Sequence, residues 1–181
     1  MGKQLISIAG SGPVLADSTV QANLLPTDGV GILMPNDLVV GDVFVLRAHG
    51  IISNVVTSPG TLELEVILGD VSVFSSGAMP LCVVAKTDVG WILELLMTCQ
   101  TAGAAASFLT QGRWVSNSAI GSLATTAGGA GSIMLPYGSV PAVGSSFDST
   151  TWNHIFLQGT WSVSDAANSI QVLGYVLEKI S

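Results

Sequence analysis

The sequence predicts an all-β protein in which antiparallel strands pack as a sandwich or a barrel. Three observations support this: apolar residues recur at every second position, Gly, Pro and Asp separate these segments, and no segment shows the apolar period of a capped helix. The chain has 181 residues, which is the size of one domain. We expect a single β-sandwich domain over residues 24–181. Residues 1–23, where Gly and Pro interrupt the apolar pattern, are a possible N-terminal arm that crosses to a neighbouring molecule.

The strands are expected where the alternation is clearest. Residues 42–52 place Phe44, Leu46, Ala48, Gly50 and Ile52 on one side of a long strand. Residues 61–68 alternate apolar side chains with Thr and Glu, which is typical of a half-buried strand. Residues 91–99 and 155–163 follow the same rule, with Glu94 and Leu96 on the side of the former strand opposite Trp91. Shorter strands are expected at residues 5–9, 31–34, 71–74, 81–84, 108–115, 133–135 and 170–177.

Turns and loops are expected between these strands. Turn-forming residues cluster at 26–29, 35–37, 58–60 and 136–138. Two further segments, 101–106 and 125–131, consist mainly of Gly, Ala, Ser and Thr and are expected as loops.

The last strand is apolar on both sides, which leaves two interpretations open. Ile170, Val172 and Val176 alternate with a second apolar set, Leu173, Tyr175 and Leu177. The second set could pack against another subunit, because a strand that is apolar on both sides is buried on both. Alternatively, a β-bulge near Gly174 shifts the register, so that one side of the sheet takes residues from both sets.

The composition favours association with other protein chains. Charged residues are only 9% of the chain, whereas about 25% is usual in soluble domains. Apolar residues make up 49% of the chain. A protein with so few charges and so many apolar residues exposes an apolar surface, which oligomers often cover. The net charge is −7, and the five Lys and Arg residues are scattered along the sequence. Binding to nucleic acid or to an anionic membrane uses clustered basic residues, so we expect neither partner.

The motifs of catalysis and cofactor binding do not occur in this sequence. There is neither a G-x-S-x-G motif nor a P-loop, and we expect no enzyme activity and no cofactor. Glu63 and Glu65 share one side of a strand at about 7 Å, a separation that glycoside hydrolases use, although an exposed acidic surface is the commoner meaning of the pattern. His49 and His154 lack a second histidine at metal-ligand spacing, so no metal site is expected.

Cysteines and tryptophans are the remaining candidates. Cys82 and Cys99 lie in apolar runs and are expected as buried thiols, with a bridge between them left open. Trp91 and Trp161 fall on strongly apolar sides and are expected in the core. The other two tryptophans, Trp114 and Trp152, could stack on a sugar.

The C-terminal third carries a resemblance to a known family. Phe147-Asp148-Ser149-Thr150, the segment 153–159, Thr160-Trp161-Ser162 and Ala166-Ala167-Asn168-Ser169-Ile170 follow one another there. This pattern resembles the C-terminal signature of small virion proteins of tailed bacteriophages, in which a hairpin closes a jelly-roll-like antiparallel β-sandwich. The middle of the chain is similar more loosely, and residues 1–30 show no such likeness.

The resemblance implies a non-enzymatic virion structural protein. The expected role is a capsid decoration or cement protein that binds and stabilises the head shell as a homotrimer, with the major capsid protein or another virion protein as partner. It would assemble in the host cytoplasm and lie on the capsid surface, and Leu173, Tyr175 and Leu177 would form the subunit interface. The alternative is a tail-fibre or head-fibre module that binds a receptor or glycan through Trp114 and Trp152. A stand-alone carbohydrate-binding domain is a further rival.

Overall fold

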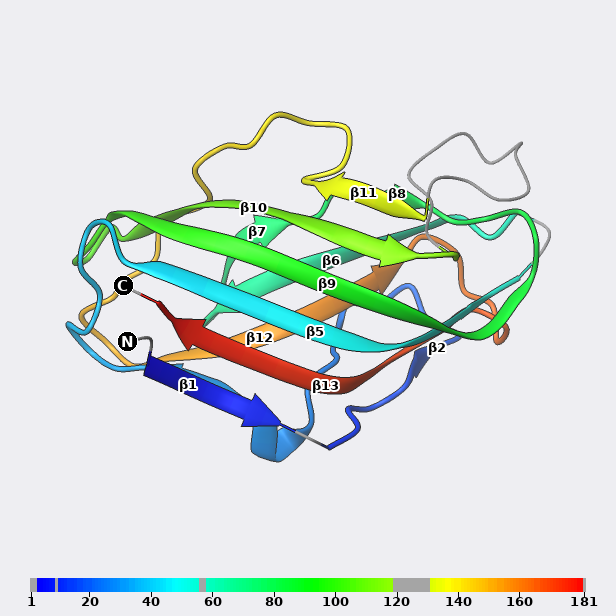
Figure 1. Ribbon diagram of the computed structural model, residues 1–181, viewed down its shortest axis with the longest axis horizontal. Coiled ribbons are helices and arrows are strands. Elements are labelled where there is room, and N and C mark those ends of the chain that lie inside the picture. Colours follow the sequence, from blue (N-terminus) through cyan, green and yellow to red (C-terminus); the bar gives the residue numbers. More distant parts are fainter. Residues whose placement is uncertain (1–2, 9, 56–57, 119–130, 181) are drawn as a thin grey trace.

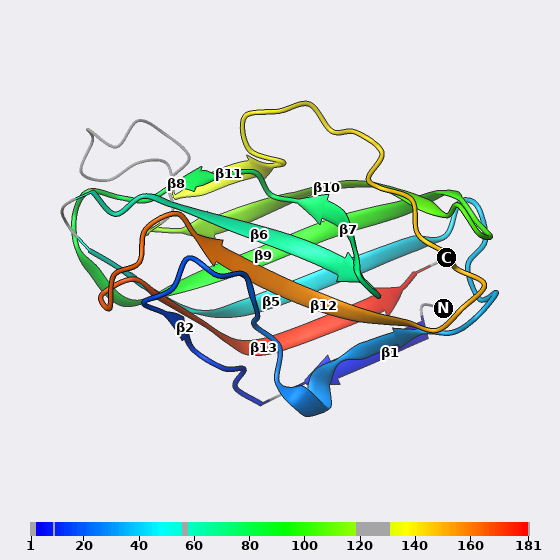
Figure 2. The same cartoon turned by 180° about the vertical axis from the view of Figure 1, so that it is seen from behind.

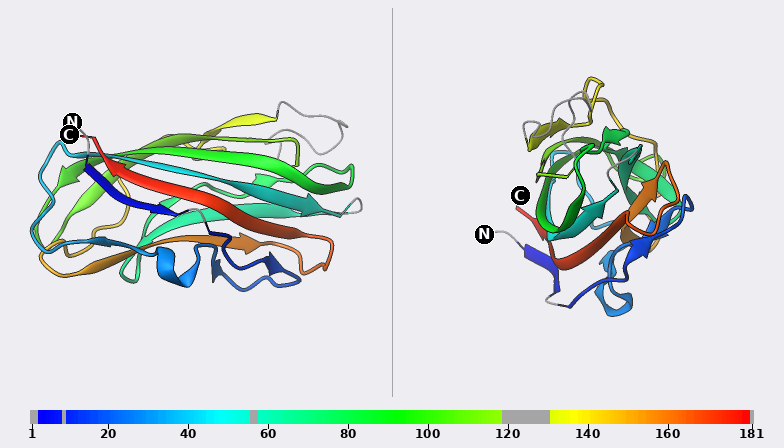
Figure 3. Two further views of the ribbon diagram at one scale, coloured as in Figure 1. Left: turned by 60° about the horizontal axis from the view of Figure 1, so that its bottom comes forward. Right: turned by 90° about the vertical axis from the view of Figure 1, so that its right-hand side faces the viewer.

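The protein is a β-sandwich of two antiparallel sheets, as seen in a computed structural model that describes residues 3–8, 10–55, 58–118 and 131–180. Figure 1 faces the seven-stranded sheet, here called sheet A, and Figure 2 faces the six-stranded sheet B. The strands run along the long axis of the molecule (Figure 3). The all-β sandwich predicted from the alternation of apolar residues is therefore confirmed.

Sheet A has the order β1-β13-β5-β9-β10-β11, and β2 also pairs with β13. Its strands are β1 (Lys3–Ile8), β2 (Leu15–Ala16), β5 (Val43–Asn54), β9 (Lys86–Thr101), β10 (Ser107–Ser116), β11 (Ser132–Leu135) and β13 (Ser169–Lys179). The two ends of the chain meet here, because Lys3 of β1 pairs with Lys179 of β13 (Figure 1).

Sheet B has the order β3-β12-β6-β7, with β4 beside β12 and β8 beside β6. Its strands are β3 (Ala22–Asn23), β4 (Gly31–Leu33), β6 (Thr61–Leu68), β7 (Val71–Ser75), β8 (Met79–Pro80) and β12 (Asn153–Trp161). A short 3₁₀ turn, η1 (Thr27–Gly29), lies between β3 and β4.

The core lies between the two sheets and is built by the predicted alternation. Sheet A contributes the inward residues of β5 and β9, and sheet B those of β6 and β12. Aromatic rings fill the middle: Trp91 stacks on Trp114 with ring centroids 4.9 Å apart, and Phe44 meets Phe108 edge to face at 5.6 Å. Such ring pairs stabilise a core beyond the apolar area that they bury.

The strand predicted at residues 81–84 is wrong. The Asn54 amide donates hydrogen bonds to the carbonyls of Cys82 and Val84, at 2.6 and 3.2 Å. The backbone amide of Cys82 bonds to the Ser118 carbonyl. Since the Asn54 side chain binds carbonyls that a ladder would need, this apolar run is held as a loop, which is buried at Leu81 and Cys82 and exposed at Val84.

The N-terminal segment is woven into the sandwich, which corrects the boundary expected at residue 23. β1 and β2 pair with β13, and β3 pairs with β12 of the same chain. Leu15 is buried, and its carbonyl accepts a hydrogen bond from the Trp161 indole. These contacts anchor the segment to both sheets.

Most of the loop predicted at 125–131 lies outside the described residues.

Candidate functional surface

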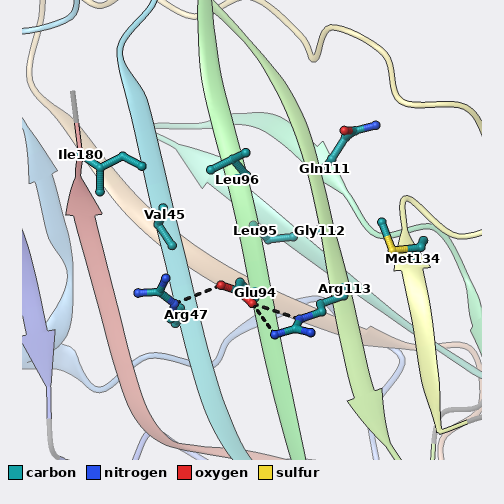
Figure 4. A pocket seen from close by; sticks show the side chains of 10 residues that line it. All are labelled: Val45, Arg47, Glu94, Leu95, Leu96, Gln111, Gly112, Arg113, Met134 and Ile180. Carbon is teal, nitrogen blue, oxygen red and sulfur yellow. Dashed lines mark hydrogen bonds and ion pairs between the residues drawn. The ribbon is translucent and has the colours of Figure 1, made fainter.

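A row of charged side chains crosses the outer surface of sheet A. Arg47, Glu94 and Arg113 come from neighbouring strands β5, β9 and β10 and stand directly opposite one another in the sheet register. The Arg47 Nε lies 3.2 Å from Glu94 Oε1, and the Arg113 Nε and a terminal guanidinium nitrogen lie 3.0 and 2.9 Å from Glu94 Oε2. Figure 4 shows both guanidinium groups turned toward this one carboxylate.

The row is electrostatically balanced at its centre. The hydrogen bonds from Arg47 and then Arg113 hold the pKa of the Glu94 carboxyl below its usual range. Arg47 also reaches Glu178 on β13, at 3.4 Å. Two positive and two negative side chains thus neutralise one another, and each ion pair is open to solvent, where such pairs contribute little stability on their own.

A shallow apolar groove of about 450 Å³ adjoins this row. Its apolar lining includes Val45 of β5, Leu96 of β9, Met134 of β11 and Ile180, which follows β13 (Figure 4). A second hollow of about 420 Å³ lies on the other side of the row, beside His49 and other residues of the same sheet. The outer surface of sheet A therefore has a charged row between two hollows.

A β-bulge decides which residues of β13 face outward. The register shifts between Val172 and Gly174, so that Leu173 is the extra residue and its side chain is exposed. Tyr175 and Leu177 are buried in the core, and burial raises the pKa of the Tyr175 hydroxyl. The bulge interpretation is confirmed. Of the predicted interface residues, Leu173 alone remains on the surface, and the assignment of Tyr175 and Leu177 to a subunit contact is wrong.

The tryptophans separate into three core residues and one surface residue. Trp91, Trp114 and Trp161 are fully or almost fully buried. Trp114 was a candidate glycan contact, but its ring stacks on Trp91 between the sheets and cannot be reached. Trp152, in contrast, is 59% exposed, just before β12. It follows a turn in which Asp148 accepts two hydrogen bonds from Thr150.

Glu63 and Glu65 form part of a polar outer surface on sheet B. Glu63 accepts a hydrogen bond from the Ser75 hydroxyl, and Glu65 accepts hydrogen bonds from Ser72 and Gln21. All of these donors are neutral, so the two carboxylates have similar environments. A catalytic acid and base, in contrast, need environments that move their pKa values apart.

The remaining sequence candidates are dispersed. His49 lies on sheet A, where its ring covers Gly174, and His154 lies on β12 of sheet B. Among the described residues, no three His, Cys, Asp or Glu side chains come close enough to hold a metal ion. Cys82 and Cys99 are both buried and unbridged, and burial raises the pKa of the Cys99 thiol.

Sequence reasoning missed the charged row because its arginines are far apart along the chain. The alternation over residues 91–99 correctly places Glu94 and Leu96 on the outer side of β9. The pairing of β9 with both β5 and β10, however, is a long-range property of the fold. The basic residues, scattered in the sequence, therefore include two that share one surface.

Within the part of the chain that the structure describes, no helix is long and apolar enough to cross a membrane. No protein-family model, curated protein or solved structure matches this chain.

Proposed function

We propose that the protein is a non-enzymatic structural component of a bacteriophage virion, a decoration or cement protein that binds the head shell as a homotrimer. It would assemble in the host cytoplasm and reside on the capsid surface. Its partners would be further copies of itself and the major capsid protein or another virion protein. Such a protein acts through buried surface area and a stiff scaffold rather than through bond chemistry.

The strand order is the observation that carries this proposal. If β1, β3 with β4, β5, β6, β7, β9, β12 and β13 are counted as strands one to eight, sheet A begins 1-8-3-6 and sheet B reads 2-7-4-5. This is the order of an eight-stranded jelly roll, a fold that viral capsid proteins use widely. The hairpin of β10 and β11 then extends sheet A beyond strand six. The order thus supports a jelly-roll-like sandwich of the kind that the C-terminal resemblance implies.

The residues that carry the resemblance have structural roles at the β12–β13 connection. The Asn168 side chain accepts a hydrogen bond from the Val55 amide and donates one to the Pro59 carbonyl. The Trp161 indole donates to the Leu15 carbonyl. Together they tie the closing hairpin to the β5–β6 connection and to the N-terminal segment. Because Asn168 and Trp161 hold the fold together, proteins that share this fold would be expected to share these residues.

Reconstitution on phage heads tests the proposal. Heads from a phage whose copy of this gene is deleted would be mixed with the purified protein and sedimented. We expect the protein to sediment with the heads and to raise the temperature at which they release DNA. Protein that stays in the supernatant with heads, and binds tails or host cells instead, would contradict the decoration role.

One observation favours a second function, a fibre module that binds a host glycan. The Trp152 ring is exposed in the segment that follows the Asp148 turn, and exposed Trp rings, with an apolar face and a polar N–H, are common at binding surfaces. Under this alternative, Trp152→Ala abolishes binding to a glycan array while the free energy of unfolding changes by less than about 0.5 kcal/mol. An array on which the wild-type protein binds nothing would remove the alternative.

A further inference from the structure

Exposed apolar side chains gather on the outer surface of sheet A formed by β13, β5, β9, β10 and β11, here called outer face A. Ile92 and Leu96 of β9 are 52% and 48% exposed, and Met134 of β11 is 70% exposed. Leu173 and Ile180 are exposed at the β13 side of the same sheet. Isolated surface residues of this kind are normal, whereas a set on one sheet face marks an interaction site.

We propose that outer face A is the surface through which one copy of this chain binds another. The inference rests on the proposed function in one respect, since it assigns a contact between copies of this chain within the proposed virion assembly. It replaces the contact expected from Tyr175 and Leu177, which the β13 bulge turns into the core. Three properties of the surface point to a second copy as its occupant.

The first property is its charge. The chain carries a net charge of −7, so two copies repel each other unless they meet where charge is locally cancelled. Arg47 and Arg113 are two of only five basic residues in the chain, and both lie on outer face A. With Glu94 and Glu178 they form a locally neutral group. This is the place where identical acidic chains can approach each other at the lowest electrostatic cost.

The second property is the order of these charges. Along the row the signs alternate from Arg47 to Glu94 to Arg113, one strand apart, which is about 4.8 Å. In a contact across a two-fold axis the same surface of both copies meets, so that surface must be compatible with itself. A copy displaced by one strand places its Glu94 against a guanidinium of its neighbour. A uniformly basic or acidic row would not allow this.

The third property is its size and relief. The surface spans five strands, and the paired length of β5 and β9 is about ten residues, which together give roughly 700 Å². Stable protein interfaces bury about 800 Å² on each partner. The charged row lies between hollows of about 450 and 420 Å³, which side chains of a second copy can fill. The surface is thus large enough for a subunit interface and shaped to interlock.

The experiment compares the native mass of the full chain and of three variants by light scattering and by sedimentation over a dilution series. Leu96→Glu and Met134→Glu place a charge on outer face A. Ile32→Glu is the matched control, because Ile32 is 41% exposed on the outer side of β4 in sheet B. Far-ultraviolet circular dichroism and urea unfolding establish whether each variant is folded. Met134 is 70% exposed on the short strand β11, so we expect Met134→Glu to fold even if Leu96→Glu does not.

We expect the wild-type protein and Ile32→Glu to form the same stable assembly. Both variants of outer face A should raise its dissociation constant at least about tenfold, which corresponds to the loss of about 1.4 kcal/mol. A wild-type monomer at all concentrations would overturn the inference, as would folded Leu96→Glu or Met134→Glu that keeps the wild-type mass. A monomer that still sediments with phage heads would overturn the interface alone. An assembly that depends on Leu96 and Met134 but ignores heads would overturn the virion function alone.

Discussion

The two outer faces of the sandwich differ although the two inner faces are alike. Both sheets turn Leu, Val and aromatic residues inward. Outward, β9 of sheet A shows Ile92, Glu94 and Leu96. On β6 of sheet B, Glu63 and Glu65 accept hydrogen bonds from Ser72, Ser75 and Gln21. The outer side of β6 therefore satisfies its carboxylates with hydrogen bonds from within the chain. Sheet A leaves apolar groups exposed around a row of side chains whose charges cancel, and the proposed contact between copies rests on this difference.

The close approach of strands in sheet A gives the largest expected effect. A Cβ atom on Gly112 of β10 would lie 2.2 Å from the Glu94 carbonyl oxygen and 2.5 Å from Leu95 Cδ2. Backbone cannot move aside as a side chain can, so Gly112→Ala must push β10 away from β9. We expect it to lower the free energy of unfolding by about 3 kcal/mol, measured by urea denaturation.

Gly159→Ala in β12 is the matched change in sheet B. There the nearest atoms are side-chain methyl groups of Leu24 and Leu15, at 3.2 and 3.3 Å. Because these side chains can shift, the cost should stay below about 1 kcal/mol. If both variants lost the same free energy of unfolding, the close approach of β10 to the β9 backbone at Gly112 would not limit the size of the side chain there.

The sequence was sufficient for features that depend on local alternation. The strand predicted over residues 61–68 has the bounds of β6, and the inward residues of β5 and β9 follow the predicted period. A Trp at an alternating position is harder to assign, and Trp114 faces the core because its neighbour Arg113 faces out. The run at 81–84 fails as a strand because Asn54, distant in sequence, binds its carbonyls. Long-range partners decide such cases, and no local pattern contains them.

The same limit applies to the candidate surface. The bulge at Gly174 was one of two interpretations of an apolar strand, and only the pairing of β13 with β5 decides between them. The neutral row requires the register of three strands at once, so the positions of Arg47 and Arg113 along the chain could not reveal it.

Neutralising one carboxylate on each face gives a smaller effect that separates stability from association. Glu94→Gln leaves Arg47 and Arg113 without their shared anion, whereas Glu65→Gln changes a group that binds only neutral donors. Solvent-exposed pairs contribute little, so each variant should lose less than about 1 kcal/mol in urea unfolding. The native mass over a dilution series should distinguish them. We expect the Glu94→Gln assembly to dissociate at higher protein concentrations than the wild-type assembly, because its copies bind each other more weakly, and the Glu65→Gln assembly to behave as wild type. Identical dissociation constants would mean that the row is incidental to the contact.

Acidity gives the finest test, because it removes the same charge without a mutation. The hydrogen bonds from Arg47 and Arg113 lower the pKa of the folded Glu94 carboxyl from 4.5. The stabilisation from its charge is therefore complete above pH 4.5 and is lost as the pH falls through the lower folded pKa. Protonation leaves the guanidinium group that faces Glu94 of the neighbouring copy opposite an uncharged side chain.

We therefore expect the wild-type assembly to dissociate as the pH is lowered below 4.5, measured as native mass across a pH series. Asp148 is the control carboxyl, since hydrogen bonds from Thr150 also lower its pKa, but it lies in the loop before β12. Asp148→Asn should keep the acid response of the wild-type protein, and Glu94→Gln should lose it. The opposite assignment would move the subunit contact from outer face A to the sheet B end of the molecule, where Trp152 is exposed.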